Sequence, residues 1–190
     1  DLIGKGLKGK QLHNAIPHRR MSATIYKNYP QGKITVTDFL LGQYYLYEDA
    51  LNSQEWNIEN DSMKVVLGHE CQKATCSFRG RKWTAWFALD VPVSDGPLKF
   101  CGLPGLIMEV YDRGKQYYFC INGMQQVSAT PITFGILDKD FKHFQKTDRK
   151  DFLLSKYRYL RNQNSINEAS TGISLGSVDE ALKYDLIERE

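Results

Sequence analysis

The sequence lacks a long hydrophobic run and lacks a large excess of charge of one sign. No apolar stretch approaches the roughly 18 residues that a membrane-spanning helix requires, so the sequence predicts no transmembrane segment. The net charge of its 190 residues is only +3 at pH 7, whereas a nucleic-acid-binding domain usually has a strongly basic patch. We therefore expect no nucleic-acid partner.

Sequence motifs for nucleophilic or phosphate chemistry are also missing. There is no G-x-S-x-G motif. Gly4, Gly6 and Gly9 spell G-x-G-x-x-G, but this stretch follows no predicted strand and opens no predicted helix, so it does not predict a dinucleotide site. The sequence predicts no catalytic residue and no cofactor.

Cysteine is scarce, with four residues in the chain: Cys71, Cys76, Cys101 and Cys120. An even number favours disulfides in an exported protein, and free thiols or a metal site in a cytosolic one. In one strand, Cys71 and Cys76 would lie roughly 17 Å apart, beyond the roughly 7 Å limit for a disulfide. Any two disulfides would therefore join one of them to Cys101 and the other to Cys120.

The segment "HECQKATC" is the one candidate for metal ligation. Strand alternation would place His69 and Cys71 on one face and Cys76 on the other. That spread does not suit a zinc site, which needs converging ligands. We expect disulfides or buried thiols here, and no bound metal.

Aromatic residues make up 12% of the chain and favour strands. Two β-rich runs surround Gly42, residues 70–91 form a hairpin turning at Arg79-Gly80, and residues 106–123 form another turning near Arg113-Gly114. Alternation predicts one face of the first hairpin that carries Trp83, Ala85, Phe87 and Leu89, and one face of the second that carries Leu106, Met108 and Val110.

The periodicity changes near the end of the chain. Asp148 is a typical N-cap, and apolar residues at helical spacing predict a helix over about residues 148–162. Residues 162–176 are rich in Gly, Ser and Asn and predict a loop. We expect one domain over residues 1–190, of the mainly β (α+β) class. Its predicted architecture is a curved antiparallel sheet or half-barrel of meandering hairpins, with the C-terminal helix packed against it.

The segment Leu103-Pro104-Gly105-Leu106 has the composition of a type II turn, with proline second and a glycine of positive φ third. Its flanks are apolar, whereas turn flanks are usually polar because they face water. Burial of these side chains is expected to stabilise the fold by roughly 1.5–3 kcal/mol each. They either fill the core of the sheet or line the mouth of an apolar cavity.

The sequence around this turn resembles the GLPGLI family, which takes its name from the hexapeptide at Gly102–Ile107. The resemblance is strongest over residues 43–125. Further landmarks stand in the family's order: Gly68, Cys71, Lys73, Ala74, Gly80, Arg81, Ala85, Trp86, Phe87, Pro92, Gly96, Pro97, Lys99 and Phe100.

This resemblance implies an exported envelope protein of Bacteroidota-type bacteria, of unknown function. The segment is also similar to the N-terminal module of some secreted peptide:N-glycanases. The resemblance implies a location in the periplasm, in the cell envelope or outside the cell, with a signal peptide already removed. It also implies that the first strands of the family domain are missing from this chain.

We therefore expect a non-catalytic exported binding or accessory module, whose partner is a hydrophobic small molecule, a peptide or an envelope protein. The alternatives are an enzyme or enzyme-associated domain acting on envelope glycans or peptides, and a structural envelope protein that recruits a partner strand. The predicted binding residues are Trp83, Trp86, Phe87, Phe100, Leu103, Pro104, Leu106 and Met108.

Overall fold

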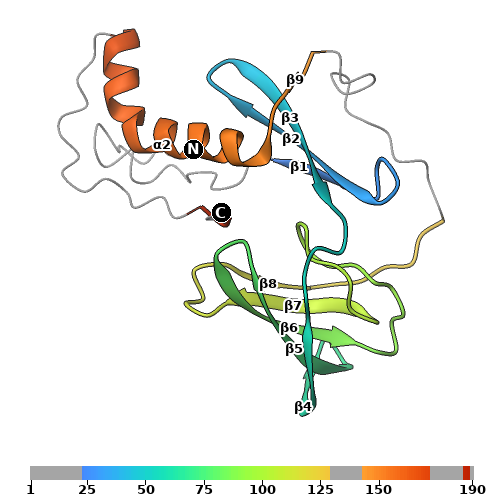
Figure 1. The fold of residues 1–190 in the computed structure, drawn as a ribbon. Coiled ribbons are helices and arrows are strands. Elements are labelled where there is room, and N and C mark those ends of the chain that lie inside the picture. The colour runs from blue at the N-terminus through green and yellow to red at the C-terminus, as the bar shows by residue number, and fades with distance from the viewer. Residues whose placement is uncertain (1–22, 129–142, 172–185, 189–190) are drawn as a thin grey trace, which may run out of the picture.

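The computed structural model describes residues 23–128, 143–171 and 186–188, and its strands form two sheets (Figure 1). The four-stranded sheet has the order β1 (Thr24–Lys27), β2 (Lys33–Leu40), β3 (Gln43–Ala50), β9 (Gln145–Lys146). The five-stranded sheet has the order β4 (Asn57–Val66), β5 (His69–Phe78), β6 (Arg81–Ala88), β7 (Leu106–Asp112), β8 (Tyr118–Cys120). The mainly β class is confirmed. In the described part of the chain the hairpins are divided between the two sheets, and neither sheet closes into a barrel.

Three hairpins turn through two residues with positive φ. The pairs are Leu41-Gly42 (51° and 80°), Leu67-Gly68 (50° and 83°) and Arg79-Gly80 (50° and 73°). This is the type I′ geometry, which matches the twist of the flanking antiparallel strands. The predicted hairpins around Gly42 and at Arg79-Gly80 are confirmed.

The predicted alternation is confirmed on β6 from Trp83 to Phe87, whereas Leu89 lies beyond the strand and is exposed. Trp83, Ala85 and Phe87 are buried and point to one face of the five-stranded sheet. There they form the main core, whose other buried members are Ala74, Cys76, Phe78, Phe100, Leu103, Ile107 and Val110.

A bulge in β7 overturns the predicted face for Val110. Trp86 pairs with Glu109 and Phe87 pairs with Ile107, so that Met108 is an extra residue in the ladder. A bulge of this kind shifts the side-chain alternation by one position. Met108 therefore packs on the opposite face with Leu106, whereas Val110 joins Ile107 in the main core.

The hexapeptide does not form the predicted type II turn. Gly105 does not have a positive φ, and the glycine that does is Gly102, at 88°. Gly105 serves a different need, because a Cβ added there would lie 1.9 Å from the Ala88 carbonyl oxygen. The hexapeptide backbone thus lies directly against the end of β6, while Leu103 is 1% exposed and fills the main core.

Helix α2 (Arg149–Thr171) packs on the four-stranded sheet. Asp148 caps it as predicted, accepting a hydrogen bond from the Lys150 amide at 2.7 Å. The Phe152 ring lies 5.4 Å from that of Tyr45 and 5.7 Å from that of Tyr47, both on β3. The predicted packing of a C-terminal helix on the sheet is therefore confirmed.

The predicted end of this helix was wrong. Residues 162–171 are helical rather than a loop, because no glycine or proline interrupts the sequence before Gly172. The rest of the predicted loop, residues 172–176, and the N-terminal stretch of residues 1–20 lie outside the described residues. Among the described residues, no helix combines the length and hydrophobicity needed to cross a bilayer.

The two sheets are joined through the loop before the hexapeptide. Lys27 on β1 forms an ion pair with Asp95 and donates hydrogen bonds to the carbonyl oxygens of Gly96 at 2.5 Å and Phe100 at 2.9 Å. From the chain between the sheets, Gln54 donates to the Lys99 carbonyl oxygen at 3.0 Å. These bonds fix the loop against the four-stranded sheet, while Phe100 reaches the core of the five-stranded sheet.

Strand β4 lies at an edge of the five-stranded sheet and pairs with β5 alone among the described strands. Its ladder is interrupted between Glu59 and Met63, and residues 60–62 have no backbone ladder partner on β5. Met63 and Val65 are half or more exposed. Interruptions of this kind are one way in which proteins disrupt a free edge.

The close approach at Gly105 gives a testable prediction. We expect Gly105→Ala to lower the free energy of unfolding by more than about 3 kcal/mol, because the clash is with backbone that cannot move aside. Urea unfolding followed by tryptophan fluorescence measures this. Gly123→Ala is the control, because its Cβ would meet nothing within 4 Å. Equal stability of the two variants would contradict the prediction.

Candidate functional site

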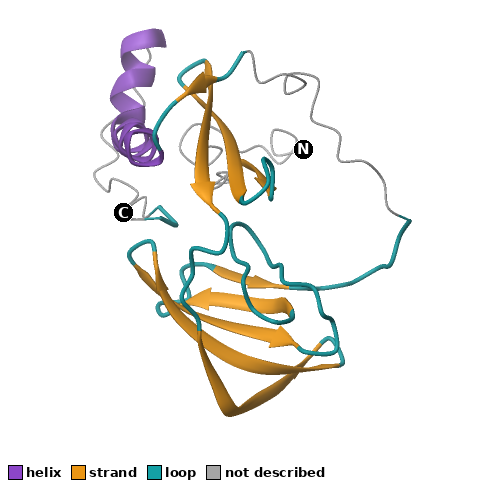
Figure 2. Cartoon of the chain, turned by 45° about the vertical axis from the view of Figure 1, so that its right-hand side comes forward, coloured by secondary structure: helices purple, strands orange, loops and turns teal. Residues whose placement is uncertain are grey.

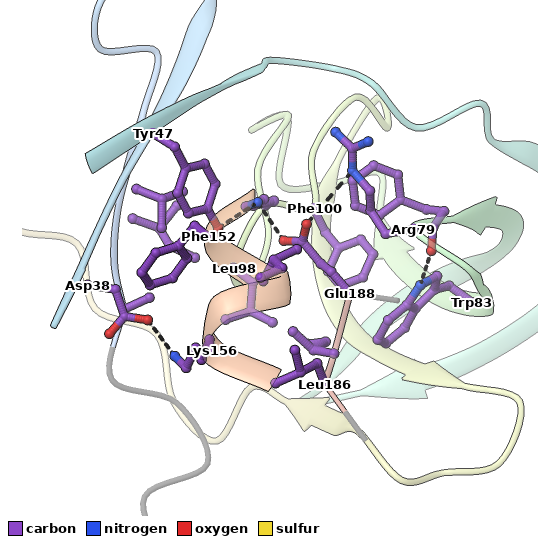
Figure 3. Close-up of a pocket in the computed structure, with 17 residues that line it drawn as sticks. Asp38, Tyr47, Arg79, Trp83, Leu98, Phe100, Phe152, Lys156, Leu186 and Glu188 are labelled. Atoms are coloured by element: carbon purple, nitrogen blue, oxygen red, sulfur yellow. Dashed lines mark hydrogen bonds and ion pairs between the residues drawn. The ribbon is translucent and has the colours of Figure 1, made fainter. Parts of the chain in front are cut away.

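A cavity of about 80 Å³ lies where the two sheets, helix α2 and segment 186–188 meet (Figure 3). Its walls are mainly apolar: Val36 and Tyr47 come from the four-stranded sheet, Phe152 from α2, and Phe78, Trp83 and Phe100 from the other side. The cavity is left because the side chains of the two sheets do not fill the space between them.

The charged side chains of Arg79, Lys99 and Glu188 line this cavity. Together with their ion-pair partners they form what we call the charge cluster: Asp49, Arg79, Lys99, Arg149 and Glu188. Lys99 is 5% exposed. Its Nζ lies 3.1 Å from Asp49 Oδ2 and 2.5 Å from Glu188 Oε1. Arg79 binds Asp49 at 2.5 Å, and Arg149 binds Glu188 at 3.1 Å.

Each member of the charge cluster comes from a different element. Asp49 is near the end of β3, Arg79 is in the β5–β6 turn and Lys99 is in the loop before the hexapeptide. Arg149 begins α2 and Glu188 belongs to segment 186–188. The cluster therefore fixes both sheets, the helix and the segment relative to one another.

The positive and negative charges of the cluster do not balance. It has three cationic side chains, Arg79, Lys99 and Arg149, against two carboxylates, which leaves one positive charge in excess. Burial, and then the carboxylates of Glu188 and Asp49, raise the pKa of Tyr47 far above its usual value. The Tyr47 hydroxyl therefore stays neutral and accepts a hydrogen bond from Lys99 at 3.3 Å.

Arg79 is incompletely satisfied. Its Nε is buried and has no hydrogen-bond partner among the described residues. This nitrogen forms only a long ion pair with Glu188 Oε2, at 3.9 Å. A buried polar atom without a partner is costly. The geometry thus leaves room for a better placed acceptor at this point.

Segment 186–188 is held by Arg81, which is buried in the five-stranded sheet. The Arg81 guanidinium donates to the carbonyl oxygens of Leu186 at 2.8 Å and Ile187 at 3.0 Å. Its remaining nitrogen binds Asp112 at 2.8 Å, which fixes the guanidinium in place. Ile187 packs against the main core.

The eight residues predicted to form one binding surface are not brought together. Trp83 and Phe100 line the cavity. Phe87 and Leu103 are buried in the main core, Pro104 is exposed, and Trp86, Leu106 and Met108 pack on the opposite face of the sheet. Alternation along β6 separates Trp83 and Phe87 from Trp86, and the bulge in β7 places Met108 on the far side.

The predicted disulfides are not formed, because all four cysteines are free. Cys71 and Cys76 lie on β5 in different hydrophobic clusters. Cys101 is buried beside Gln54, at 3.8 Å from its Oε1, and Cys120 is exposed on the edge strand β8. His69 binds Asp90 at 2.6 Å. Among the described residues no group of three metal-ligating side chains converges.

Sequence reasoning missed the charge cluster. One signal was visible in Lys99, a lysine between Leu98 and Phe100 in a stretch expected to be buried, since a buried lysine requires a paired anion. The anions themselves carried no such signal, because Asp49 is 50 positions away from Lys99.

A family model described as "Protein of unknown function (Porph_ging)" matches residues 79–109. The match covers the β5–β6 turn, β6, the hexapeptide and the start of β7, and it supports a domain of unknown function. The GLPGLI family name stays a prediction. No curated protein matches the chain.

Two solved structures of PNGF-II are similar to this chain, and the chain spans only 22% of each. The structure in the C2 space group has a TM-score of 0.42 and 16% identity over 65% of this chain. The structure in the P21 space group has a TM-score of 0.42 and 15% identity over 65%. Similarity of this extent carries no argument about function.

We expect Lys99→Met to lower the free energy of unfolding by about 1.5–3 kcal/mol, because Asp49 and Glu188 each lose one buried ionic contact and keep only their arginine partner. The control is Lys33→Met, which removes an exposed pair with Glu48 and should cost less than about 1 kcal/mol. Urea unfolding of both variants measures the difference. A loss no larger than that of the control would show that the cluster does not stabilise the fold.

The cysteines give a second prediction. Burial raises the pKa of Cys76 to about 12 and also raises the pKa values of Cys71 and Cys101. Iodoacetamide at about pH 8 should therefore modify Cys120 alone in the native protein, since the thiolate is the reactive form. Intact mass measures the number of labels, and unfolding without reductant should release three more thiols. Fewer than four in total would show a disulfide.

Proposed function

We propose that this chain is a non-catalytic binding module that holds an apolar side chain of an extended peptide or protein partner in the cavity between its sheets. The observation that supports this is the combination of an apolar cavity with charged groups at its border. Sites with apolar walls and a few fixed polar groups are typical of ligand binding.

The size of the cavity favours a peptide over a lipid or other large hydrophobic ligand. Its 80 Å³ is well below the roughly 300–1,000 Å³ of most small-molecule pockets. It is also below the roughly 150 Å³ of an engineered cavity that binds benzene. One aliphatic side chain suits this space, and the rest of the partner would lie along the border.

The charged groups beside the cavity are suited to binding rather than to proton transfer. General acid–base catalysis needs a group whose pKa lies near the working pH. Here Tyr47 is held neutral by its raised pKa, and the carboxylates of Asp38, Asp49 and Glu188 are each engaged by a cation. A module of this kind functions alone or as the accessory domain of an enzyme, so enzyme association stays a prediction.

We also propose export to the periplasm, the cell envelope or the exterior, on the resemblance of residues 43–125 alone. The four free thiols add no support for an oxidising compartment. Fractionation of the source cells, followed by detection of the protein, tests the location, and recovery from the cytosol alone would refute it.

We expect that random peptides displayed on phage and selected on the full chain will share an apolar anchor residue. Ala23→Leu should weaken their binding at least about tenfold, because Ala23 lines the cavity and the larger side chain fills it. Fluorescence anisotropy measures the affinity.

The matched control is Ala50→Leu, on an exposed position at the end of β3 that does not line the cavity. It should leave the affinity unchanged. Selection of no peptide, or equal binding to both variants, would refute the proposed function.

A further inference from the structure

Segment 186–188 lies beside the cavity as a bound peptide would, and we call the space that it occupies the cleft. It is more than 100 positions from Arg81, which donates to two consecutive backbone carbonyl groups. Hydrogen bonds to main-chain atoms hold an extended peptide whatever its side chains are. In Figure 2 the segment lies between α2 and the five-stranded sheet, and it belongs to no strand or helix.

The side chains of the segment meet surroundings that match their chemistry. Leu186 and Ile187 line the apolar cavity. The Glu188 carboxylate lies between Lys99, at 2.5 Å, and Arg149, at 3.1 Å. Figure 3 shows this carboxylate pointing toward Arg79. The cleft therefore accepts two apolar residues followed by an acidic one.

The fit of the segment is incomplete at two points. In the part of the chain that the structure describes, Arg79 Nε lacks a hydrogen-bond partner although Glu188 is its neighbour. The cavity beside Leu186 and Ile187 remains at about 80 Å³. A peptide with a larger apolar residue and a carboxylate closer to Arg79 would satisfy both points.

We propose that segment 186–188 is an intramolecular ligand, and that partner peptides carrying two apolar residues followed by Asp or Glu displace it. This inference rests on the proposed function and names the sequence class of the peptide. A tethered segment competes at an effective concentration in the millimolar range. It therefore raises the apparent Kd for an external peptide by the reciprocal of the fraction of sites that it leaves empty.

The test uses the full chain and a fluorescein-labelled peptide with the sequence of residues 183–190, KYDLIERE. Glu188→Gln removes the charge of the tethered segment at nearly the same side-chain size, while Lys99 keeps its ion pair with Asp49. We expect the peptide to bind this variant about tenfold more tightly than the unmodified chain, because fewer sites are occupied. Glu55→Gln is the matched control, an exposed carboxylate outside the cluster, and should bind as the unmodified chain does.

Two further peptides test the proposed sequence class. KYDLIQRE should bind Glu188→Gln at least about fivefold more weakly than KYDLIERE, because a charged carboxylate forms the stronger hydrogen bonds to Lys99 and Arg149. A scrambled peptide should not bind. Equal affinity of KYDLIERE for all three proteins, or binding of the scrambled peptide, would overturn the inference.

A second variant guards against misfolding of Glu188→Gln. Ile187→Ser removes an apolar contact of the segment instead of its charge, and it should tighten KYDLIERE binding in the same direction. Size-exclusion chromatography of the unmodified chain adds an independent measurement. A dimer whose cleft is filled by the segment of a second copy would refute intramolecular occupancy.

The failure of this inference is distinguishable from failure of the proposed function. If phage-selected peptides bind and lose affinity on Ala23→Leu while KYDLIERE does not bind Glu188→Gln, the module binds peptides and the sequence class is wrong. If neither kind of peptide binds, both the inference and the proposed function are wrong.

Discussion

The relative position of the two sheets depends on the buried side chain of Lys99. A buried ammonium group is tolerated only with anions beside it, and here Asp49 and Glu188 provide them from the four-stranded sheet and from segment 186–188. Because Leu98 and Phe100 pack against the main core, the backbone on both sides of Lys99 is anchored to the five-stranded sheet. One side chain thereby ties three parts of the chain together beside a cavity that their apolar surfaces leave unfilled.

Local chemistry made much of the fold predictable. The hairpins at Gly42 and Arg79-Gly80 follow from glycine at positions that need positive φ, with alternating residues on either side. Asp148 was identifiable as a cap because its side chain acts within the next two residues. By contrast, Gly105 was misread, since its role depends on the backbone of Ala88 in another strand. The bulge at Met108 was missed for the same reason, because strand pairing decides it and composition does not.

Less of the candidate site was predictable, because its residues come from distant parts of the sequence. Trp83 and Phe100 were named because large aromatic residues near an apolar turn are conspicuous, and both line the cavity. The charge cluster was not found, because its partners are separated by 50 positions for Asp49 and Lys99, and by 39 for Arg149 and Glu188. Sequence patterns report on neighbours along the chain, whereas this site is assembled from five elements that meet only after folding.

The interrupted ladder of β4 has a consequence for the behaviour of the protein at high concentration. A free strand is a template for fibril growth when roughly six consecutive residues present a flat, uncharged backbone. The gap between Glu59 and Met63 divides β4 into two arms, Asn57–Glu59 and Met63–Val66, each shorter than such a template. Apolar Met63 and Val65 are therefore displayed beside an interrupted ladder, which disfavours the growth of a cross-β stack from this edge.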